Sequence, residues 1–170
     1  MSQPTDDAPP PPNRVHHLLQ IAATPGVVFD AVAIPERLAG WWTTEVHGEP
    51  AAPGARLQLF FGPFTPELEI VALEAPTGIT WEGRGGHDPW GQRTTIHFNL
   101  TDAPGGTRVS FWHMLGEERD SATVGTANFT WGYYLNSLRR LCETGRGTPF
   151  DADTPGARVG ADPLPRTQQP

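Results

Sequence analysis

The spacing of apolar residues changes twice along the chain, and each change predicts a different kind of element. Residues 15–23 predict a first strand, with Leu19, Ile21 and Ala23 on one face. Thr24 followed by Pro25 predicts a helix start, with a capping hydroxyl and a proline at the first helical position. Pro35 ends that helix and opens a second short one over Glu36 to Gly40. The apolar face of the first helix carries Val28, Phe29 and Val32.

Between residues 56 and 115 the apolar side chains recur at every second position, which predicts strands joined by short turns. Val71 interrupts the alternation and indicates a bulge. We expect turns at residues 75–78 and 102–106, and a glycine-rich loop from Gly83 to Gly91. The predicted inward positions include Leu57, Leu59, Phe61, Leu68, Ile70, Ile79, Trp81, Ile96, Phe98, Leu100, Val109, Phe111, His113 and Leu115.

The last element predicted is one long amphipathic helix. It begins between Ser121 and Thr126 and ends at Gly145, a residue type favoured just beyond a helix C-terminus. Phe129 and Tyr133 fall on the side opposite its apolar face. That face carries Val124, Ala127, Trp131, Tyr134, Leu135, Leu138, Leu141 and Cys142.

These elements together predict an α+β domain with the helix-grip arrangement. A curved antiparallel sheet of about six to seven strands wraps around the long C-terminal helix, and two short helices follow the first strand. Such an arrangement leaves a cavity between sheet and helix. The domain is expected over residues 14–150, preceded by a disordered Pro-rich arm at residues 1–13 and followed by a disordered tail at residues 151–170.

Composition and charge argue against several classes of partner and indicate the compartment. A net charge of −7 and a pI near 5.2 argue against nucleic acid or an anionic membrane as partner. Cys142, the single cysteine, excludes an intrachain disulfide and a cysteine-rich zinc site. The sequence shows neither a signal peptide nor an apolar run long enough for a membrane span, which predicts a cytoplasmic protein. We expect neither a metal nor a cofactor, because no motif for either is present.

Three segments carry a resemblance to a known family: TPGVVFDAVAIPERLAGWW, TRVSFWH and WGYYLNSLRRLCETGRGTPF. They resemble the START or helix-grip superfamily (SRPBCC, polyketide cyclase-like), and within it the branch of proteins like the activator of the heat-shock ATPase. The likeness covers about residues 15–150. It implies a hydrophobic cavity between sheet and long helix. Members of the superfamily bind lipids, polyketides or hormones, and others are cyclases or co-chaperones, so the resemblance leaves the activity open.

The cavity predicted from these patterns is rich in aromatic side chains. An aromatic lining suits a flat or ring-shaped ligand, and the same side chains can equally be ordinary core. We expect the ligand to enter past the loop from Gly83 to Gly91, whose glycines permit opening. The candidate ligand-binding residues are Phe61, Trp81, Phe98, Phe111, His113, Asn128, Trp131, Tyr134 and Leu138.

His113 is the one candidate for acid–base chemistry. Strand alternation points it inward, where an apolar environment favours its neutral form. It could orient a ligand hydroxyl or carbonyl. The alternative is a structural histidine whose ring is satisfied by a backbone carbonyl or by Asn128.

Three functions remain open from the sequence. The first is a protein that binds a hydrophobic or aromatic small molecule. The second is an enzyme of the cyclase or aromatase type that uses His113, with Tyr134 as a possible second group. The third is a co-chaperone acting through outward aromatic residues, Trp112, Phe129 and Tyr133, which could equally form a homodimer face.

Overall fold

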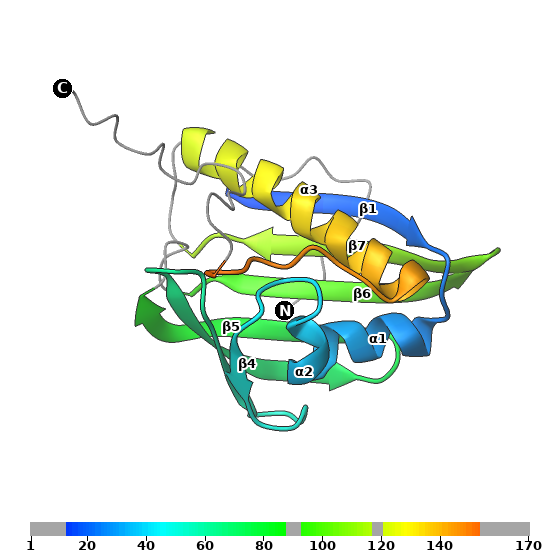
Figure 1. Ribbon diagram of the computed structural model, residues 1–170, viewed down its shortest axis with the longest axis horizontal. Coiled ribbons are helices and arrows are strands. Elements are labelled where there is room, and N and C mark those ends of the chain that lie inside the picture. Colours follow the sequence, from blue (N-terminus) through cyan, green and yellow to red (C-terminus); the bar gives the residue numbers. More distant parts are fainter. Residues whose placement is uncertain (1–12, 88–92, 117–120, 154–170) are drawn as a thin grey trace.

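The computed structural model describes residues 13–87, 93–116 and 121–153 (Figure 1). Seven strands and three helices follow one another along the chain. In order they are β1 (Arg14–Ile21), α1 (Pro25–Ala33), α2 (Pro35–Leu38), β2 (Val46–Gly48), β3 (Arg56–Leu59), β4 (Thr65–Glu74), β5 (Gly78–His87), β6 (Thr95–Ala103), β7 (Gly106–Met114) and α3 (Ser121–Thr144).

All seven strands form one antiparallel sheet in the order β1-β7-β6-β5-β4-β3-β2. The chain starts on one edge, crosses to the other through α1 and α2, and then returns strand by strand until β7 pairs with β1. Figure 1 shows α3 lying along β1 and β7, with α1 and α2 on the same side of the sheet. The predicted α+β helix-grip fold is therefore confirmed, with its long C-terminal helix held against the sheet.

The residues predicted to start and end the helices do so in the structure. The Thr24 hydroxyl accepts a hydrogen bond from the Val27 N–H at 3.4 Å, and Pro25 opens α1. Ile34 closes that helix, because Pro35 starts α2 directly after it. At the other end of the chain α3 stops at Thr144, and Gly145 takes a φ of +83°, a conformation that glycine adopts without steric cost.

The alternation along the strands also holds, including its interruption. The pairing of β4 with β5 shifts register between Ile70 and Ala72, so Val71 is a bulge, as its break in the pattern predicts. The inward positions Leu68, Ile70, Ile96 and Phe98 are at most 2% exposed. Their burial fixes the sheet face on which α1 and α3 pack.

The glycine-rich segment was predicted wrongly. Residues 83–87 are not a loop, because β5 continues to His87 and pairs with β4 as far as Thr65. Gly86 explains why glycine is needed there: at its φ of +77°, an added Cβ would lie 2.1 Å from the Thr65 carbonyl oxygen. The rest of the expected loop, residues 88–91, lies outside the described residues.

Trp112 lies on the outer side of the sheet, as its phase predicts, but it is not an exposed side chain. Its ring stacks on His16 with centroids 3.7 Å apart, and the Arg14 guanidinium lies 5.5 Å from the ring centre. Only 2% of the residue is exposed. Trp112 therefore drops out of the surface that a partner protein could contact, and Phe129 and Tyr133 remain.

The described residues begin inside the predicted N-terminal arm. Asn13 is already part of the fold, because its carbonyl accepts a hydrogen bond from the Leu115 N–H. Most of the predicted arm and tail lies outside the described residues. Within the described parts of the chain, no helix is both long and apolar enough to cross a membrane.

Candidate functional site

The centre of the domain is a cluster of aromatic side chains between the sheet and α3. Trp42, which directly follows α2 and its short extension, lies in the middle of this cluster. Its ring centroid is 5.4 Å from that of Trp41, 5.1 Å from that of Trp131 and 6.1 Å from that of Trp81. All four residues are at most 3% exposed. Four indole rings therefore pack together between the sheet and α3.

The aromatic contacts continue across the sheet through its inward positions. Phe111 on β7 lies 4.4 Å from Trp131 and 5.0 Å from Phe98, measured between ring centroids. Phe98 on β6 in turn lies 5.8 Å from Trp81 on β5. Three neighbouring strands and α3 thus contribute to one continuous aromatic cluster.

His113 sits at the edge of this cluster with both ring nitrogens bound to side chains. The Trp131 Nε1–H donates to His113 Nδ1 at 2.7 Å, and His113 Nε2 lies 2.6 Å from the Thr94 hydroxyl. The Thr94 hydroxyl also lies 3.1 Å from the Met114 carbonyl oxygen, to which it donates. An indole N–H can only donate, so Nδ1 must carry a lone pair and Nε2 the proton. The order of donors and acceptors is therefore fixed from Trp131 through His113 and Thr94 to Met114.

This arrangement holds His113 in its neutral form. The side chain is fully buried, and burial lowers its pKa to about 3. Protonation would also place a second N–H against the Trp131 donor. The structural alternative for His113 named a backbone carbonyl or Asn128 as its partner, whereas the hydrogen bonds shown join the ring to Thr94 and Trp131.

One end of the aromatic cluster reaches the surface at Phe61. This residue follows β3 in a tight turn, bridged to Phe64, and does not continue the strand. Its ring centroid lies 5.9 Å from Trp42, 6.0 Å from Tyr134 and 5.8 Å from Phe150. Phe61 and Phe150 are partly exposed, whereas Trp42 and Tyr134 are buried. We call Phe61, Tyr134 and Phe150 the aromatic mouth.

The segment that carries Phe150 is bound tightly across the end of the cluster. Phe150 exchanges backbone hydrogen bonds with Trp42 and Thr44, each 2.9 Å long. Ser137 on α3 donates to the Trp41 carbonyl at 2.8 Å and accepts from the Thr148 N–H at 2.6 Å. The mouth is therefore framed by the 60–64 turn, by α3 and by the chain that follows α3.

The structure brings most of the predicted binding residues together. Asn128 is the exception, since it is exposed and is hydrogen-bonded to His17 on β1. Burial lowers the pKa of His17, and hydrogen bonds to Asn128 partly oppose that shift. Phe61 is partly exposed at the mouth. The residues found within the buried core are Trp81, Phe98, Phe111, His113, Trp131, Tyr134 and Leu138.

The indole nitrogens of the core differ in their partners. Trp41 Nε1–H donates to the Ala31 carbonyl at 2.8 Å, and Trp131 Nε1–H donates to His113. Trp81 is 0% exposed, and among the described residues its Nε1 has no hydrogen-bond partner. Most buried donors in proteins are paired, so this nitrogen calls for an explanation.

Four residues of the site are absent from the residues predicted by sequence. Trp42 and Phe150 had a usable signal, because both belong to segments that the family resemblance picked out. Thr94 and Ser137 had none, since a single hydroxyl within an alternating strand or a helix does not reveal its partner. Their roles depend on contacts between residues 11 to 96 positions apart in the chain.

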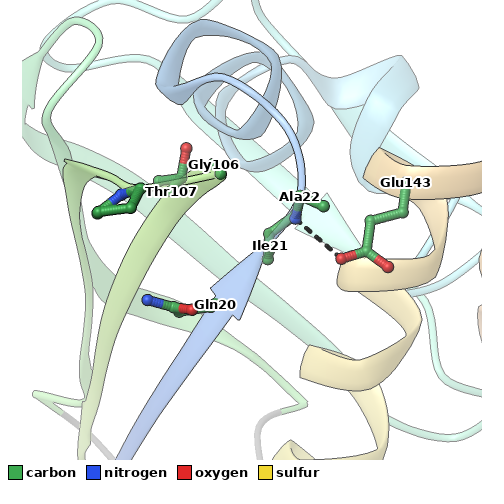
Figure 2. Close-up of a pocket in the computed structure, with 8 residues that line it drawn as sticks. Gln20, Ile21, Ala22, Gly106, Thr107 and Glu143 are labelled. Carbon is green, nitrogen blue, oxygen red and sulfur yellow. Dashed lines mark hydrogen bonds between the residues drawn. The ribbon is translucent and has the colours of Figure 1, made fainter.

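A separate pocket of about 180 Å³ lies at the far end of β1 (Figure 2). It is formed where β1, the β6–β7 turn and the end of α3 meet. Glu143 accepts a hydrogen bond there from the Ala22 N–H at 2.9 Å, so its carboxylate serves to fix the chain after β1. The lining comprises Gln20, Ile21, Ala22, Pro104, Gly105, Gly106, Thr107 and Glu143, and includes none of the predicted site residues.

Comparison with known proteins agrees with this architecture. The family described as Activator of Hsp90 ATPase homolog 1-like protein matches residues 22–143, well over half of the chain. That segment runs from the start of α1 through nearly all of α3, and so includes the aromatic cluster and His113. No curated protein sequence matches the chain.

Solved structures share the fold at low sequence identity. The Aha1 dimer from Colwellia psychrerythraea has a TM-score of 0.70 and 24% identity, over 79% of this chain and 98% of that one. DynU16, from the dynemicin biosynthetic locus, has a TM-score of 0.69 and 21% identity, over 81% of this chain and 49% of that one. CalU16 from Micromonospora echinospora has a TM-score of 0.58 and 18% identity, over 74% and 75%.

Proposed function

The chain belongs to the family of Activator of Hsp90 ATPase homolog 1-like proteins, and from this we propose that it binds an apolar, aromatic small molecule between its sheet and α3. The observation that carries the proposal is the aromatic cluster around Trp42, which reaches the surface at the aromatic mouth. The partly exposed rings of Phe61 and Phe150 at the edge of this cluster support a route from the surface to its interior.

The aromatic mouth offers the ligand a route into the core. Residues 83–87, where entry was expected from the sequence, are paired in β5. Phe61 is held by a short turn and by ring contacts, so it can move without breaking a strand pairing. Displacing its ring would uncover Trp42, which lies next to Trp81 and Trp131. We therefore expect the ligand to enter past Phe61.

The chemistry of this route selects the ligand class. Burying apolar surface contributes about 25 cal/mol per Å², and indole and phenyl rings favour flat ring systems. A charged ligand would lose its hydration with little to replace it, because the cluster is built from apolar rings. DynU16, which shares the fold, comes from the biosynthetic locus of a natural product, dynemicin. The likeness to DynU16 supports the fold of this chain and does not identify a ligand.

The test is binding of tetralin, a two-ring aromatic hydrocarbon, to the full chain labelled with 15N on its tryptophans. Tetralin is expected to shift the indole resonances of the core tryptophans. Phe61→Ser removes the ring that would cover the ligand once it has entered, and is expected to weaken binding about fivefold to tenfold, which corresponds to about 1–1.4 kcal/mol of apolar contact. Native mass spectrometry followed by denaturing extraction would identify any compound that copurifies.

Phe60→Ser is the matched control. Phe60 is the adjacent residue and is also partly exposed, but its ring packs against His47, 4.8 Å away. This variant should bind tetralin as the wild type does. The proposal fails if tetralin shifts no indole resonance and no apolar compound copurifies with the protein.

The geometry gives less support to a cyclase that uses His113. Both ring nitrogens are occupied by Trp131 and Thr94, so the imidazole could act on a ligand only after one of these bonds is broken. With a pKa of about 3 it is also a weak base near neutral pH. His113 is better explained as the residue that holds the Trp131 ring in place.

A second candidate function is association of two copies through α3. Phe129 and Tyr133 are 69% and 41% exposed on the helix side that faces away from the sheet, and the similar Colwellia protein is described as a dimer. The same surface is what a heat-shock ATPase partner would require. Phe129→Ser is expected to shift a dimer toward monomer in sedimentation velocity, whereas Val27→Ser, at a 41% exposed position of α1, should not. A wild-type protein that stays monomeric at high concentration would rule out the dimer.

A further inference from the structure

We propose that the indole N–H of Trp81 is the hydrogen-bond donor that recognises a single acceptor oxygen, that of a carbonyl group, on the aromatic ligand. This inference rests on the proposed function and adds to it a polar group that the ligand must carry. It is drawn from one unusual feature of the core, a buried donor that the described residues leave without an acceptor.

The surroundings of Trp81 exclude an acceptor from the sheet face itself. The residues paired with Trp81 across the sheet are Ile70 on β4 and Ile96 on β6, which are 2% and 0% exposed. Among the described residues, the rings that contact Trp81 are those of Trp42 and Phe98, at 6.1 and 5.8 Å between centroids. Aliphatic side chains accept no hydrogen bond, and the face of a ring accepts only a weak one.

Such a donor is costly, and a simple substitution would avoid the cost. Leaving a buried N–H without a partner destabilises a protein, because the lost hydration is not replaced. Phenylalanine at position 81 would keep an aromatic ring in the core and remove the donor. The chain uses phenylalanine at the neighbouring inward positions of β6 and β7, Phe98 and Phe111, so an aromatic core does not require indole there. The indole N–H of Trp81 is therefore best explained by a partner that is present only in the complex.

The position of Trp81 fits the route of entry. Trp42 separates it from Phe61, with ring centroids 5.9 Å apart on one side and 6.1 Å apart on the other. A ligand that displaces Phe61 and slides along Trp42 would bring its leading edge to Trp81. The acceptor oxygen would then lie at the inner end of the ligand, and the apolar ring system would lie toward the mouth.

This arrangement favours ligands that carry one acceptor oxygen and no other polar group at their inner end. One acceptor satisfies the one donor, whereas further polar groups at the inner end would be buried without partners. Aromatic ketones meet this requirement, whereas a phenol would bury its O–H without an acceptor. Aromatic hydrocarbons would still bind through the rings, but without the hydrogen bond.

The experiment compares 1-tetralone with tetralin, which share a ring system and differ by one carbonyl group. Both are titrated into the full chain and into Trp81→Phe, each labelled with 15N on tryptophan. The wild type is expected to bind 1-tetralone about tenfold more tightly than tetralin, and Trp81→Phe is expected to remove that preference, which corresponds to about 1.4 kcal/mol. The resonance missing in Trp81→Phe identifies the Trp81 N–H, which should move downfield with 1-tetralone and not with tetralin.

Trp41→Phe is the matched control, because the N–H that it removes already donates to the Ala31 carbonyl. It should preserve the preference for 1-tetralone. If both compounds bind and the preference is equal in the wild type and Trp81→Phe, the inference is wrong while the proposed function stands. If neither compound binds, the proposed function and the inference fall together. A Trp81 N–H resonance that 1-tetralone leaves unmoved would also overturn the inference.

Discussion

Trp131 and Trp81 both lie next to Trp42 and both bury an indole N–H, but the two N–H groups differ in whether they have a hydrogen-bond acceptor. Trp131 on α3 donates its N–H to His113, which continues through Thr94 to the Met114 carbonyl. Trp81 on β5 is as fully buried, but its N–H has no acceptor among the described residues. An indole N–H loses the same hydration in both places, so the two sites differ only in what replaces it.

The difference separates the part of the core that fixes the fold from the part that can respond to a ligand. The Trp131 network ties α3 to β6 and β7, and every bond in it has a defined donor and acceptor. The environment of Trp81 is made of rings and aliphatic side chains, which can shift without losing a hydrogen bond. Three predictions test this division.

Lowering the pH should have the largest effect on the stability of the fold. It should act through His113, which is hydrogen-bonded to Trp131. The pKa of His113 is about 3 when folded and 6.5 when unfolded. Below pH 6.5 the unfolded chain therefore binds a proton that the folded protein does not, and stability falls as the pH drops from 6.5 toward 3. The slope from this residue is about 1.4 kcal/mol per pH unit. Denaturant unfolding at a series of pH values measures it, and the lowered pKa values of His17 and His97 add in the same direction.

His113→Gln isolates the contribution of this residue. A glutamine amide can accept from Trp131 and donate to Thr94, but it does not titrate. We expect the slope below pH 6.5 to decrease by about 1.4 kcal/mol per pH unit in this variant. His47→Asn is the control, because the His47 side chain is 66% exposed. An unchanged slope in His113→Gln would show that His113 is not held neutral in the fold.

Trp131→Phe should have the next largest effect. The variant removes the donor to His113 Nδ1 and part of a buried ring. The lost packing and the unsatisfied imidazole nitrogen together should lower the free energy of unfolding by about 2–4 kcal/mol. Urea unfolding monitored by circular dichroism measures the change. A loss well below 1 kcal/mol would mean that the hydrogen bond to His113 adds little to stability.

The sequence predicts the framework around these two tryptophans well. Period-two alternation indicates the strands and the inward direction of Trp81, Phe111 and His113, and the break at Val71 indicates the bulge. Helical periodicity places Trp131 toward the sheet. These predictions succeed because burial of one face imposes a period that can be read locally.

The contacts that distinguish the tryptophans could not be predicted in the same way. The partner of His113 depends on where α3 crosses β7 and on the register of β6, which places Thr94 opposite the end of β7. The glycine-rich end of β5 was misread because glycines at positive φ usually mark loops, whereas Gly85 and Gly86 stay paired with β4. Tertiary placement decides these features, and local patterns do not record it.

Trp81→Phe in the unliganded protein should have the smallest effect, and it is the sharpest test of the comparison. The variant loses part of a buried ring, as Trp131→Phe does, but it also removes a donor that gains nothing from the described residues. The lost packing costs stability, and the removed penalty of about 1–3 kcal/mol offsets it. The free energy of unfolding should therefore stay within about 1 kcal/mol of the wild type, so that the two Trp→Phe variants differ by about 1–5 kcal/mol. Equal losses in both variants would mean that the Trp81 N–H is satisfied in the free protein, and the distinction between a structural and a ligand-responsive side of the core would disappear.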